Sequence, residues 1–264
     1  MTADADLGRV LADIVEAAGR EIMPLWRSGL QVDRKADESP VTEADRRGEA
    51  LILKQLAERF PGVPVVSEED ASEVGTPDQI GSRFFLVDPL DGTKAFVRGD
   101  EHWTVNIGLI QDGRPVAGAV SAPAWDRTWF TTSGGARMRN IGDEEGDQIH
   151  VRPWPQTGAI ALISHTMKPE TADKLAAEYG FDLREPMDSS IKFCRIAEGA
   201  ADIYPRHGTT MEWDTAAGQA IANFSGCTVE TLSGQPLPYN KPSLLNDSFL
   251  CKINSNIYEP EKAS

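Results

Sequence analysis

The chain has 264 residues, 40% of them hydrophobic and 25% charged, which is typical of an ordinary globular protein and argues against a disordered, collagen-like or coiled-coil chain. Acidic residues outnumber basic ones by 41 to 26, and this formal net charge of −15 argues against a nucleic-acid polymer as partner. No apolar run reaches the roughly 18 residues of a membrane span, and the acidic start of the chain lacks a signal-peptide core. The 3 cysteines stand far apart without CxxC spacing, which argues against a disulfide scaffold or a zinc cluster. We therefore expect a cytoplasmic protein without a membrane span.

The first half of the chain predicts helices followed by a meander of strands. Apolar residues recur at three- and four-residue steps over 4–28, which predicts an amphipathic helix, and the polar stretch 29–40 predicts a loop. Thr42 and Asp45 resemble a capping signal that opens a second helix, which a Pro-Gly pair ends near Phe60. Strands are predicted at 63–67, 84–87, 103–110, 116–121 and 128–132.

The second half alternates strand and helix patterns. Residues 134–158 are rich in glycine, proline and charge, and they mark the expected boundary between an N-terminal half, 1–150, and a C-terminal half, 151–264. Strands are predicted at 160–164, 202–204 and 227–232, and helices at 169–179, 190–198 and 213–224. The polar tail 255–264 is expected to be loosely held. The mixture favours layered sheets and helices, an α+β fold.

The most informative segment is Asp88-Pro89-Leu90-Asp91-Gly92-Thr93. A buried strand delivers Asp88 to its end, Pro89 biases the chain to turn, and Gly92 permits a conformation that a side chain opposes. The two carboxylates can then converge, which suits a hard cation such as Mg²⁺. An ordinary surface turn explains the local pattern equally well, because Pro-x-Asp-Gly is also good turn chemistry.

Two further acidic sites stand at the ends of predicted elements. Glu68 and Glu69 follow the predicted strand 63–67, and Asp214 opens the predicted helix 213–224. Each also has a simpler interpretation, because acids after a strand are often a solvated loop and an aspartate at a helix start is often an N-cap.

Taken together, these motifs resemble the inositol monophosphatase superfamily of metal-dependent, lithium-sensitive phosphatases. They stand in order along the chain as Pro40-Val41-Thr42-Glu43-Ala44-Asp45, Ser67-Glu68-Glu69, the segment 88–93 and Trp213-Asp214-Thr215-Ala216-Ala217-Gly218. The resemblance implies a layered α-β-α-β-α sandwich of the inositol monophosphatase and fructose-1,6-bisphosphatase type. It also implies two or three Mg²⁺ ions in each site.

The resemblance assigns the metal ligands residue by residue. Glu68, Asp88 and the carbonyl of Leu90 resemble the ligands of a first ion. Asp88, Asp91 and Asp214 resemble those of a second ion, and a third, weaker ion in many relatives also uses the position of Glu68.

The same resemblance assigns the catalytic groups. Thr93 and Asp45 resemble the pair that orients and activates a water, and the N–H groups of Gly92 and Thr93 could hold the phosphate. Glu69 is at most a supporting acid. Phosphoryl transfer needs mainly positioning and electrostatic stabilisation, so no protein nucleophile is required. We assign no role to the cysteines and expect His102 and His150 to lie on the surface.

The second half resembles the 3′(2′),5′-bisphosphate nucleotidase branch of the superfamily, through the segments 189–194 and 197–206. Those relatives remove the 3′-phosphate of adenosine 3′,5′-bisphosphate, a by-product of sulfate assimilation. Arg206 and Lys192 would offer a second anion site, because guanidinium and ammonium groups suit a phosphate. Ser164 and His165 resemble the Ser-His pair that lies near the nucleoside in these nucleotidases, and Ser189 is a further candidate substrate-binding residue. Lys192, Arg206 and His165 could equally be solvated surface residues.

One departure from the branch is Ala95, where these nucleotidases commonly have Glu. This difference bears on the rate and the substrate more than on the reaction type. The alternative within the family is a phosphatase of inositol phosphate or histidinol phosphate. A glycosidase also uses paired carboxylates, and a metal or nucleotide sensor could keep the fold without turnover. The sequence leaves a homodimer open.

Overall fold

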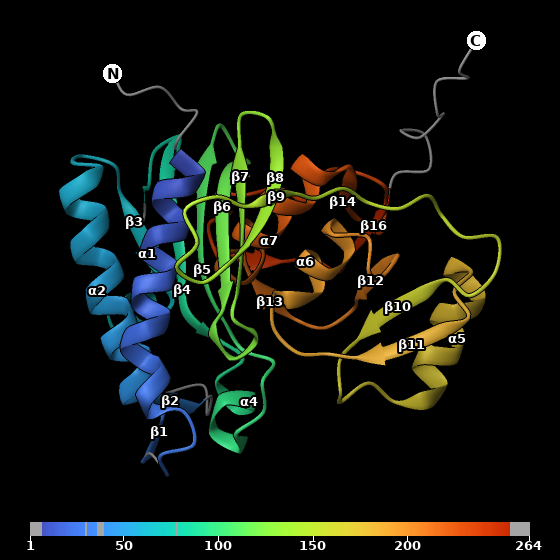
Figure 1. Cartoon of the computed structure of the whole chain (residues 1–264), viewed down its shortest axis with the longest axis horizontal. Helices are drawn as coiled ribbons and strands as arrows, with labels where there is room; N and C mark the ends of the chain where they lie inside the picture. Colours follow the sequence, from blue (N-terminus) through green and yellow to red (C-terminus); the bar gives the residue numbers. More distant parts are fainter. Residues whose placement is uncertain (1–6, 30, 36–39, 78, 254–264) are drawn as a thin grey trace.

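The computed structural model describes residues 7–29, 31–35, 40–77 and 79–253. Its elements stack in five layers (Figure 1). The helices α1 (Leu7–Ile22) and α2 (Glu43–Arg59) cover one face of a seven-stranded sheet, and α6 (Ile191–Ala197) and α7 (Glu212–Ser225) cover the other. A five-stranded sheet follows, and α5 (Pro169–Tyr179) forms the outermost layer. The expected α-β-α-β-α sandwich is confirmed.

The large sheet carries the acidic segment 88–93 at the end of its second strand. Its strands lie in chain order, with β3 parallel to β4 and every later pair antiparallel. The strands are β3 (Val65–Ser67), β4 (Arg83–Asp91), β5 (Thr104–Gln111), β6 (Arg114–Ala122), β7 (Arg127–Thr132), β8 (Gly135–Asn140) and β9 (Asp147–Gln148). The last two were not predicted, because they lie in the glycine-rich stretch 134–158.

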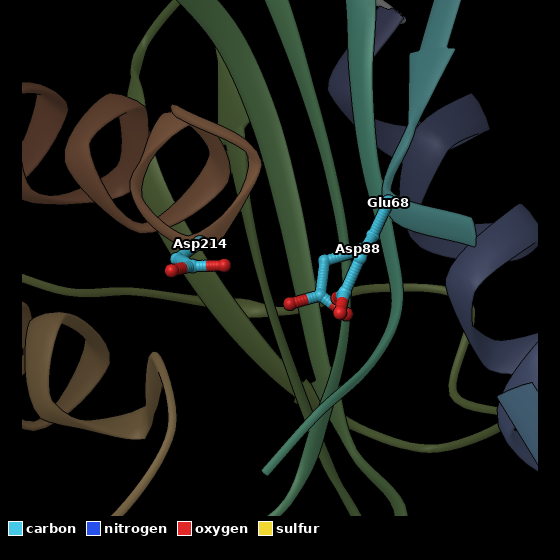
Figure 2. A group of neighbouring side chains, drawn as sticks. All are labelled: Glu68, Asp88 and Asp214. Atoms are coloured by element: carbon cyan, nitrogen blue, oxygen red, sulfur yellow. The ribbon is translucent and has the colours of Figure 1, made fainter. Parts of the chain in front are cut away.

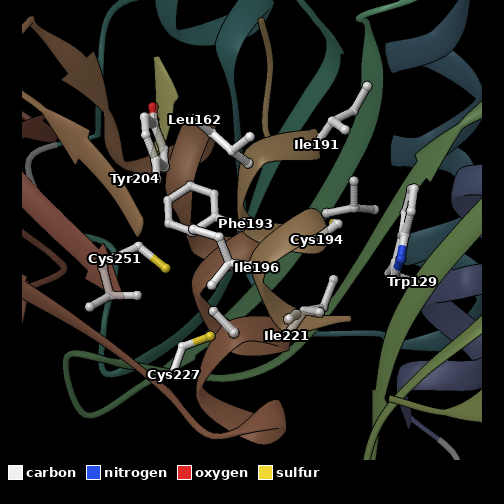
Figure 3. Packing of buried hydrophobic residues seen from close by; sticks show 14 of the residues in the cluster. Trp129, Leu162, Ile191, Phe193, Cys194, Ile196, Tyr204, Ile221, Cys227 and Cys251 are labelled. Carbon is white, nitrogen blue, oxygen red and sulfur yellow. The ribbon is translucent and has the colours of Figure 1, made fainter. Parts of the chain in front are cut away.

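The small sheet has the order β11-β10-β12-β16-β14. Its strands are β10 (Ile160–Ile163), β11 (Leu183–Pro186), β12 (Ile203–Arg206), β14 (Cys227–Thr231) and β16 (Phe249–Ile253). The central strand β12 runs parallel to β10 and antiparallel to β16. Helix α6 fills the space between the two sheets with buried apolar side chains, among them Phe193 and Ile196, and all three cysteines lie in this core (Figure 3).

Several short elements differ from the sequence prediction. The predicted loop 29–40 contains β1 (Val32–Arg34), which pairs antiparallel with β2 (Pro40–Thr42). The acids after β3 form a short helix, α3 (Glu68–Val74), and the segment 88–93 leads into α4 (Thr93–Arg98).

The first helix ends at Ile22, because Pro24 opens the 3₁₀ turn η2 (Met23–Leu25). A second such turn is η3 (Pro123–Trp125), and the strands β13 (Thr210–Met211) and β15 (Leu245–Asn246) pair separately. The predicted helix start at 4–6 and the tail 255–264 lie outside the described residues.

Helix α7 lies unusually close to the large sheet. A Cβ atom built on Gly108 of β5 would lie 2.6 Å from the Cβ of Ala216, and one on Gly118 of β6 would lie 2.7 Å from the carbonyl oxygen of Ala217. Glycine is therefore required at both positions for this approach. Asp214 lies in the first turn of α7, so the same contact determines how far Asp214 lies above the sheet. In the described part of the chain, no helix has the length and hydropathy needed to cross a membrane.

Candidate metal centre

Three carboxylates from three elements converge at the end of strand β4. Asp88 is 1% exposed near the end of β4, Glu68 begins α3, and Asp214 lies in the first turn of α7. Their ligand atoms all lie within 4.8 Å of one another (Figure 2). The acids that the sequence placed at separate element ends therefore form one cluster, in which Asp214 also caps α7 by accepting a 2.8 Å hydrogen bond from the backbone N–H of Met211.

The cluster is electrostatically unfavourable without a cation. Burial raises the pKa of Asp88 well above its usual value, and the facing Glu68, Asp91 and Asp214 raise it further. Burial and the charge of Asp91 act in the same direction on Asp214. A buried group of carboxylates with raised pKa values is the donor set that a hard divalent cation prefers, because the ion's charge restores the ionised form. The residues therefore fit Mg²⁺.

The other two predicted ligands, Asp91 and Leu90, lie beside this cluster in the wall of the same cavity. Asp91 ends β4, and its Oδ2 accepts a 2.6 Å hydrogen bond from the backbone N–H of Ser190. The backbone N–H of Leu90 donates to Oδ1 of Asp88 at 3.0 Å, and its carbonyl accepts from the hydroxyl of Thr93 at 3.1 Å. The segment thus holds its own carboxylates in position through its backbone.

Gly92 provides the turn on which the motif depends. Its φ of +93° lies in the left-handed region, and a Cβ atom there would lie 2.8 Å from the carbonyl oxygen of His102. The turn brings Thr93 to the start of α4, where its hydroxyl lies 3.2 Å from Oδ1 of Asp45. The two residues of the predicted pair therefore lie within hydrogen-bond distance of each other.

Asp45 has two functions in the fold. Its Oδ2 accepts hydrogen bonds of 2.7 Å from both the backbone N–H and the hydroxyl of Thr42, which makes the predicted capping box of α2. Its Oδ1 faces Thr93. Burial raises the pKa of Asp45 to about 6, although the hydrogen bonds from Thr42 lower it.

Lys35 is a site residue that the sequence analysis missed. Lys35 is the residue directly after β1. Its ammonium lies 2.7 Å from a Glu68 oxygen and 2.8 Å from a Glu69 oxygen. Burial opposes the charge of Lys35, but the two glutamates outweigh burial and raise its pKa. Burial also raises the pKa of Glu69 to about 7, despite the hydrogen bond from Lys35. A lone lysine in a polar stretch carries no sequence signal for this contact.

A cavity of about 550 Å³ extends from the carboxylates to the small sheet. Arg206 of β12 is in its wall, where its Nη2 donates to the carbonyl of Thr209 at 3.0 Å. The Nε of Arg206 is buried and has no hydrogen-bond partner among the described residues. This position suits the predicted contact with an anionic substrate.

Lys192 and Ser189 also lie in the cavity wall, but Lys192 is 4% exposed. Its ammonium donates to the carbonyls of Ser189, at 2.7 Å, and Met187, at 3.2 Å. Burial lowers the pKa of Lys192 to about 8, although the charge of Asp91 opposes this. Ser189 has a φ of +55°, an uncommon conformation for a residue other than glycine. Lys192 thus stabilises this turn through hydrogen bonds in addition to lining the cavity.

The histidines differ in part from the prediction. The imidazole of His165 is exposed and faces Asp188, with 3.3 Å between Nδ1 and Oδ2, whereas the flanking Ser164 and Thr166 lie in the cavity wall. His102 is only partly exposed; its ring lies 5.5 Å from that of His165 and 5.7 Å from that of Trp125. Burial lowers the pKa of His102. His150 is exposed, as predicted.

Comparison with known proteins defines the class. The sequence profile of the inositol monophosphatase family matches residues 6–259, and the chain belongs to this family. The predicted branch is confirmed as well. The chain is 39% identical over 252 residues to the 3′(2′),5′-bisphosphate nucleotidase CysQ of Escherichia coli K12, covering 92% of this chain and 98% of that protein. It is 38% identical over 248 residues to the enzyme of the same name from Salmonella typhimurium, with the same coverage.

Solved structures agree with this assignment. The crystal structure of CysQ from Bacteroides thetaiotaomicron is 33% identical, covers 94% of this chain and 97% of its own, and superposes with a TM-score of 0.79. An inositol monophosphatase from Thermotoga maritima is 20% identical with a TM-score of 0.74 over 92% of this chain and 91% of its own, and it shows the shared fold alone.

Proposed function

We propose that the protein is a Mg²⁺-dependent phosphatase that hydrolyses the 3′-phosphate of adenosine 3′,5′-bisphosphate to AMP and phosphate, and so serves sulfur metabolism. The observation that carries the proposal is the convergence of Glu68, Asp88 and Asp214 beside the pair of Thr93 and Asp45. The curated relatives named as 3′(2′),5′-bisphosphate nucleotidases support the substrate.

Glu68, Asp88, Asp91, Asp214 and the carbonyl of Leu90 would hold two Mg²⁺ ions, with a third near Glu68. When bound, such ions supply an activated water and neutralise the charge that develops on the ester oxygen. The N–H groups at the start of α4, after Gly92, would orient the phosphate.

Thr93 and Asp45 would remove the proton of the attacking water. The water donates its proton to the Thr93 hydroxyl oxygen, and the hydroxyl passes its own proton to Oδ1 of Asp45, 3.2 Å away. A carboxyl with a pKa of about 6 suits a general base near neutral pH. The hydrogen bonds from Thr42 keep the Asp45 carboxylate oriented during this transfer.

A panel of phosphate esters tests the proposal. Phosphate release is measured from adenosine 3′,5′-bisphosphate, inositol 1-phosphate and histidinol phosphate, with Mg²⁺ and with excess EDTA. We expect the bisphosphate to have the highest kcat/KM and EDTA to abolish turnover. Faster turnover of inositol 1-phosphate or histidinol phosphate would replace the substrate but leave the metal centre in place. Full activity in EDTA would overturn the metal assignment.

A further inference from the structure

The first turn of α7 carries a second acidic residue beside the candidate metal ligand Asp214. Glu212 is fully buried and stands two residues before Asp214. We propose that Glu212 and Lys241 are positioning residues of the metal centre. Their ion pair holds the segment 238–246 against the start of α7 and so fixes the Asp214 carboxylate for Mg²⁺. This inference rests on the metal centre of the proposed function.

The Asp214 carboxylate depends on the backbone in front of its helix. Its Oδ2 accepts a 2.8 Å hydrogen bond from the backbone N–H of Met211, and the described residues offer this carboxylate no further hydrogen bond. The direction in which Asp214 points toward Asp88 and Glu68 is therefore set by where the backbone of Met211 lies (Figure 2).

The segment 238–246 fixes the backbone at this point. The short strand β15 within it pairs antiparallel with β13. The carbonyl of Leu244 accepts a 2.8 Å hydrogen bond from the N–H of Glu212, and the side-chain amide of Asn246 donates to the carbonyl of Met211 at 2.8 Å. Both polar groups of the peptide that joins Met211 to Glu212 are thus bonded to this one segment.

The Glu212 side chain holds the same segment in return. Its carboxylate accepts hydrogen bonds from the backbone N–H groups of Asn240, at 2.8 Å, and Lys241, at 2.9 Å. Its Oε1 also lies 2.7 Å from the ammonium of Lys241. A buried carboxylate with three charge-assisted contacts is held in one place, and the loss of either charge would leave the other buried without its partner.

Lys241 also sets the orientation of the Asn246 side chain. Its ammonium lies 3.2 Å from Oδ1 of Asn246. An ammonium can only donate, so the amide oxygen of Asn246 has to face it. The amide nitrogen then faces the carbonyl of Met211 and the hydroxyl of Thr215, which is 3.0 Å away. One cation therefore connects Glu212 with the amide that holds Met211.

Calorimetric titration of the metal-free protein with Mg²⁺ measures Kd without any substrate. We expect Glu212→Gln to raise Kd for Mg²⁺ about 10–100-fold, the usual cost of losing a group that supports a metal ligand. Lys241→Met should also raise Kd. Charge alone predicts the opposite for this variant, because the loss of a cation makes the region more attractive to a metal ion. Lys241→Arg keeps the charge and should bind Mg²⁺ nearly as the wild type does.

Phosphate release separates this role from substrate binding. Saturating Mg²⁺ should restore most of the turnover of Glu212→Gln and Lys241→Met, with KM for the bisphosphate close to that of the wild type. A raised KM at saturating Mg²⁺, with an unchanged Kd for the metal, would place the two residues in substrate binding and overturn the inference.

Asp202→Asn is the matched control. Asp202 is also fully buried, and its carboxylate accepts two hydrogen bonds from Arg152 and one from the backbone N–H of Ile160. Its loss should lower Tm and leave Kd for Mg²⁺ unchanged. An equal rise in Kd for Asp202→Asn would reduce the effect to general destabilisation and overturn the inference, as would tighter binding by Lys241→Met or an unchanged Kd for Glu212→Gln.

Failure of the proposed function gives a different result. A wild type that does not bind Mg²⁺ would overturn the metal centre itself, and the inference with it. A wild type that binds Mg²⁺ but does not hydrolyse the bisphosphate would overturn the proposed substrate, while the Kd values of the variants still decide the roles of Glu212 and Lys241.

Discussion

Removal of one carboxylate from the metal centre should stabilise the protein when no metal is bound. Asp88→Asn keeps the side-chain shape and the oxygen that accepts from the N–H of Leu90, but it removes a buried charge. Ligand atoms of Glu68 and Asp214 lie within 4.8 Å of Asp88. At an effective dielectric constant of about 20, two unit charges at that distance repel by about 3 kcal/mol.

Protonation limits this repulsion, and the pH dependence follows from it. A carboxyl whose pKa is higher in the folded than in the unfolded chain binds more protons when folded. The contribution of these carboxyls to the stability of the metal-free protein is therefore greatest below their unfolded pKa of about 4 and is lost as pH rises through the folded values. Asp45, with a pKa of about 6, and Glu69, with about 7, place much of this loss between about pH 4 and 7. We expect Asp88→Asn to gain about 1–3 kcal/mol at pH 8 and little at pH 5.

Thermal unfolding in EDTA and in Mg²⁺ measures these effects. Each kcal/mol corresponds to about 2–4 °C in Tm for a chain of this size. Mg²⁺ should raise Tm of the wild type more than that of Asp88→Asn. The control is Asp202→Asn, because Asp202 is buried but receives hydrogen bonds of 2.8 and 2.6 Å from Arg152, and its loss should lower Tm at both pH values. A lower Tm for Asp88→Asn in EDTA at pH 8 would refute the reasoning.

Three further predictions concern activity and local structure. Asp88→Asn should lower phosphate release by several orders of magnitude and Glu69→Gln by much less; similar losses would mean that the two acids are wrongly assigned. Arg206→Ala should raise KM for the bisphosphate about 10–100-fold and leave inositol 1-phosphate unaffected, which steady-state kinetics can check. Gly92→Ala should cost about 1–3 kcal/mol in denaturant unfolding, because its φ is +93° and the added Cβ meets the carbonyl oxygen of His102; unchanged stability would contradict the strained turn.

The sequence predicts most of the elements that bury a regular apolar face, although the buried strand β16 was not predicted. Helices α2, α5, α6 and α7 were expected close to their observed ranges, whereas α1 is shorter than predicted. Strand β8 was not predicted, because its charged residues have their partners on a part of the chain that is distant in sequence. The guanidinium of Arg139 in β8 binds Glu16 at 2.8 Å and Asp13 at 2.6 Å on α1, a pairing that no local pattern shows.

For the site, the sequence predicted the acidic residues and the cations Lys192 and Arg206 of the cavity wall, but not Lys35. Asp88 and Asp214 stand in recognisable motifs, whereas the partners of Lys35 and Lys192 depend on the direction of long side chains in the folded protein. The sequence analysis therefore described the carboxylates without the lysine that lies beside Glu68. The division of the chain near residue 150 and a homodimer stay predictions.

The close contact between α7 and the large sheet has a consequence for the order of folding. Glu68 and Asp88 lie on neighbouring elements of the first half of the chain, where β3 pairs parallel with β4. Asp214 joins them only through the packing of α7 against Gly108 and Gly118, so we expect the repulsion among the three carboxylates to appear when α7 packs against the sheet. Apolar packing of α7 has to overcome that repulsion before any ion can bind. We therefore expect Mg²⁺ to slow the unfolding of the protein and to leave the early steps of its folding unchanged.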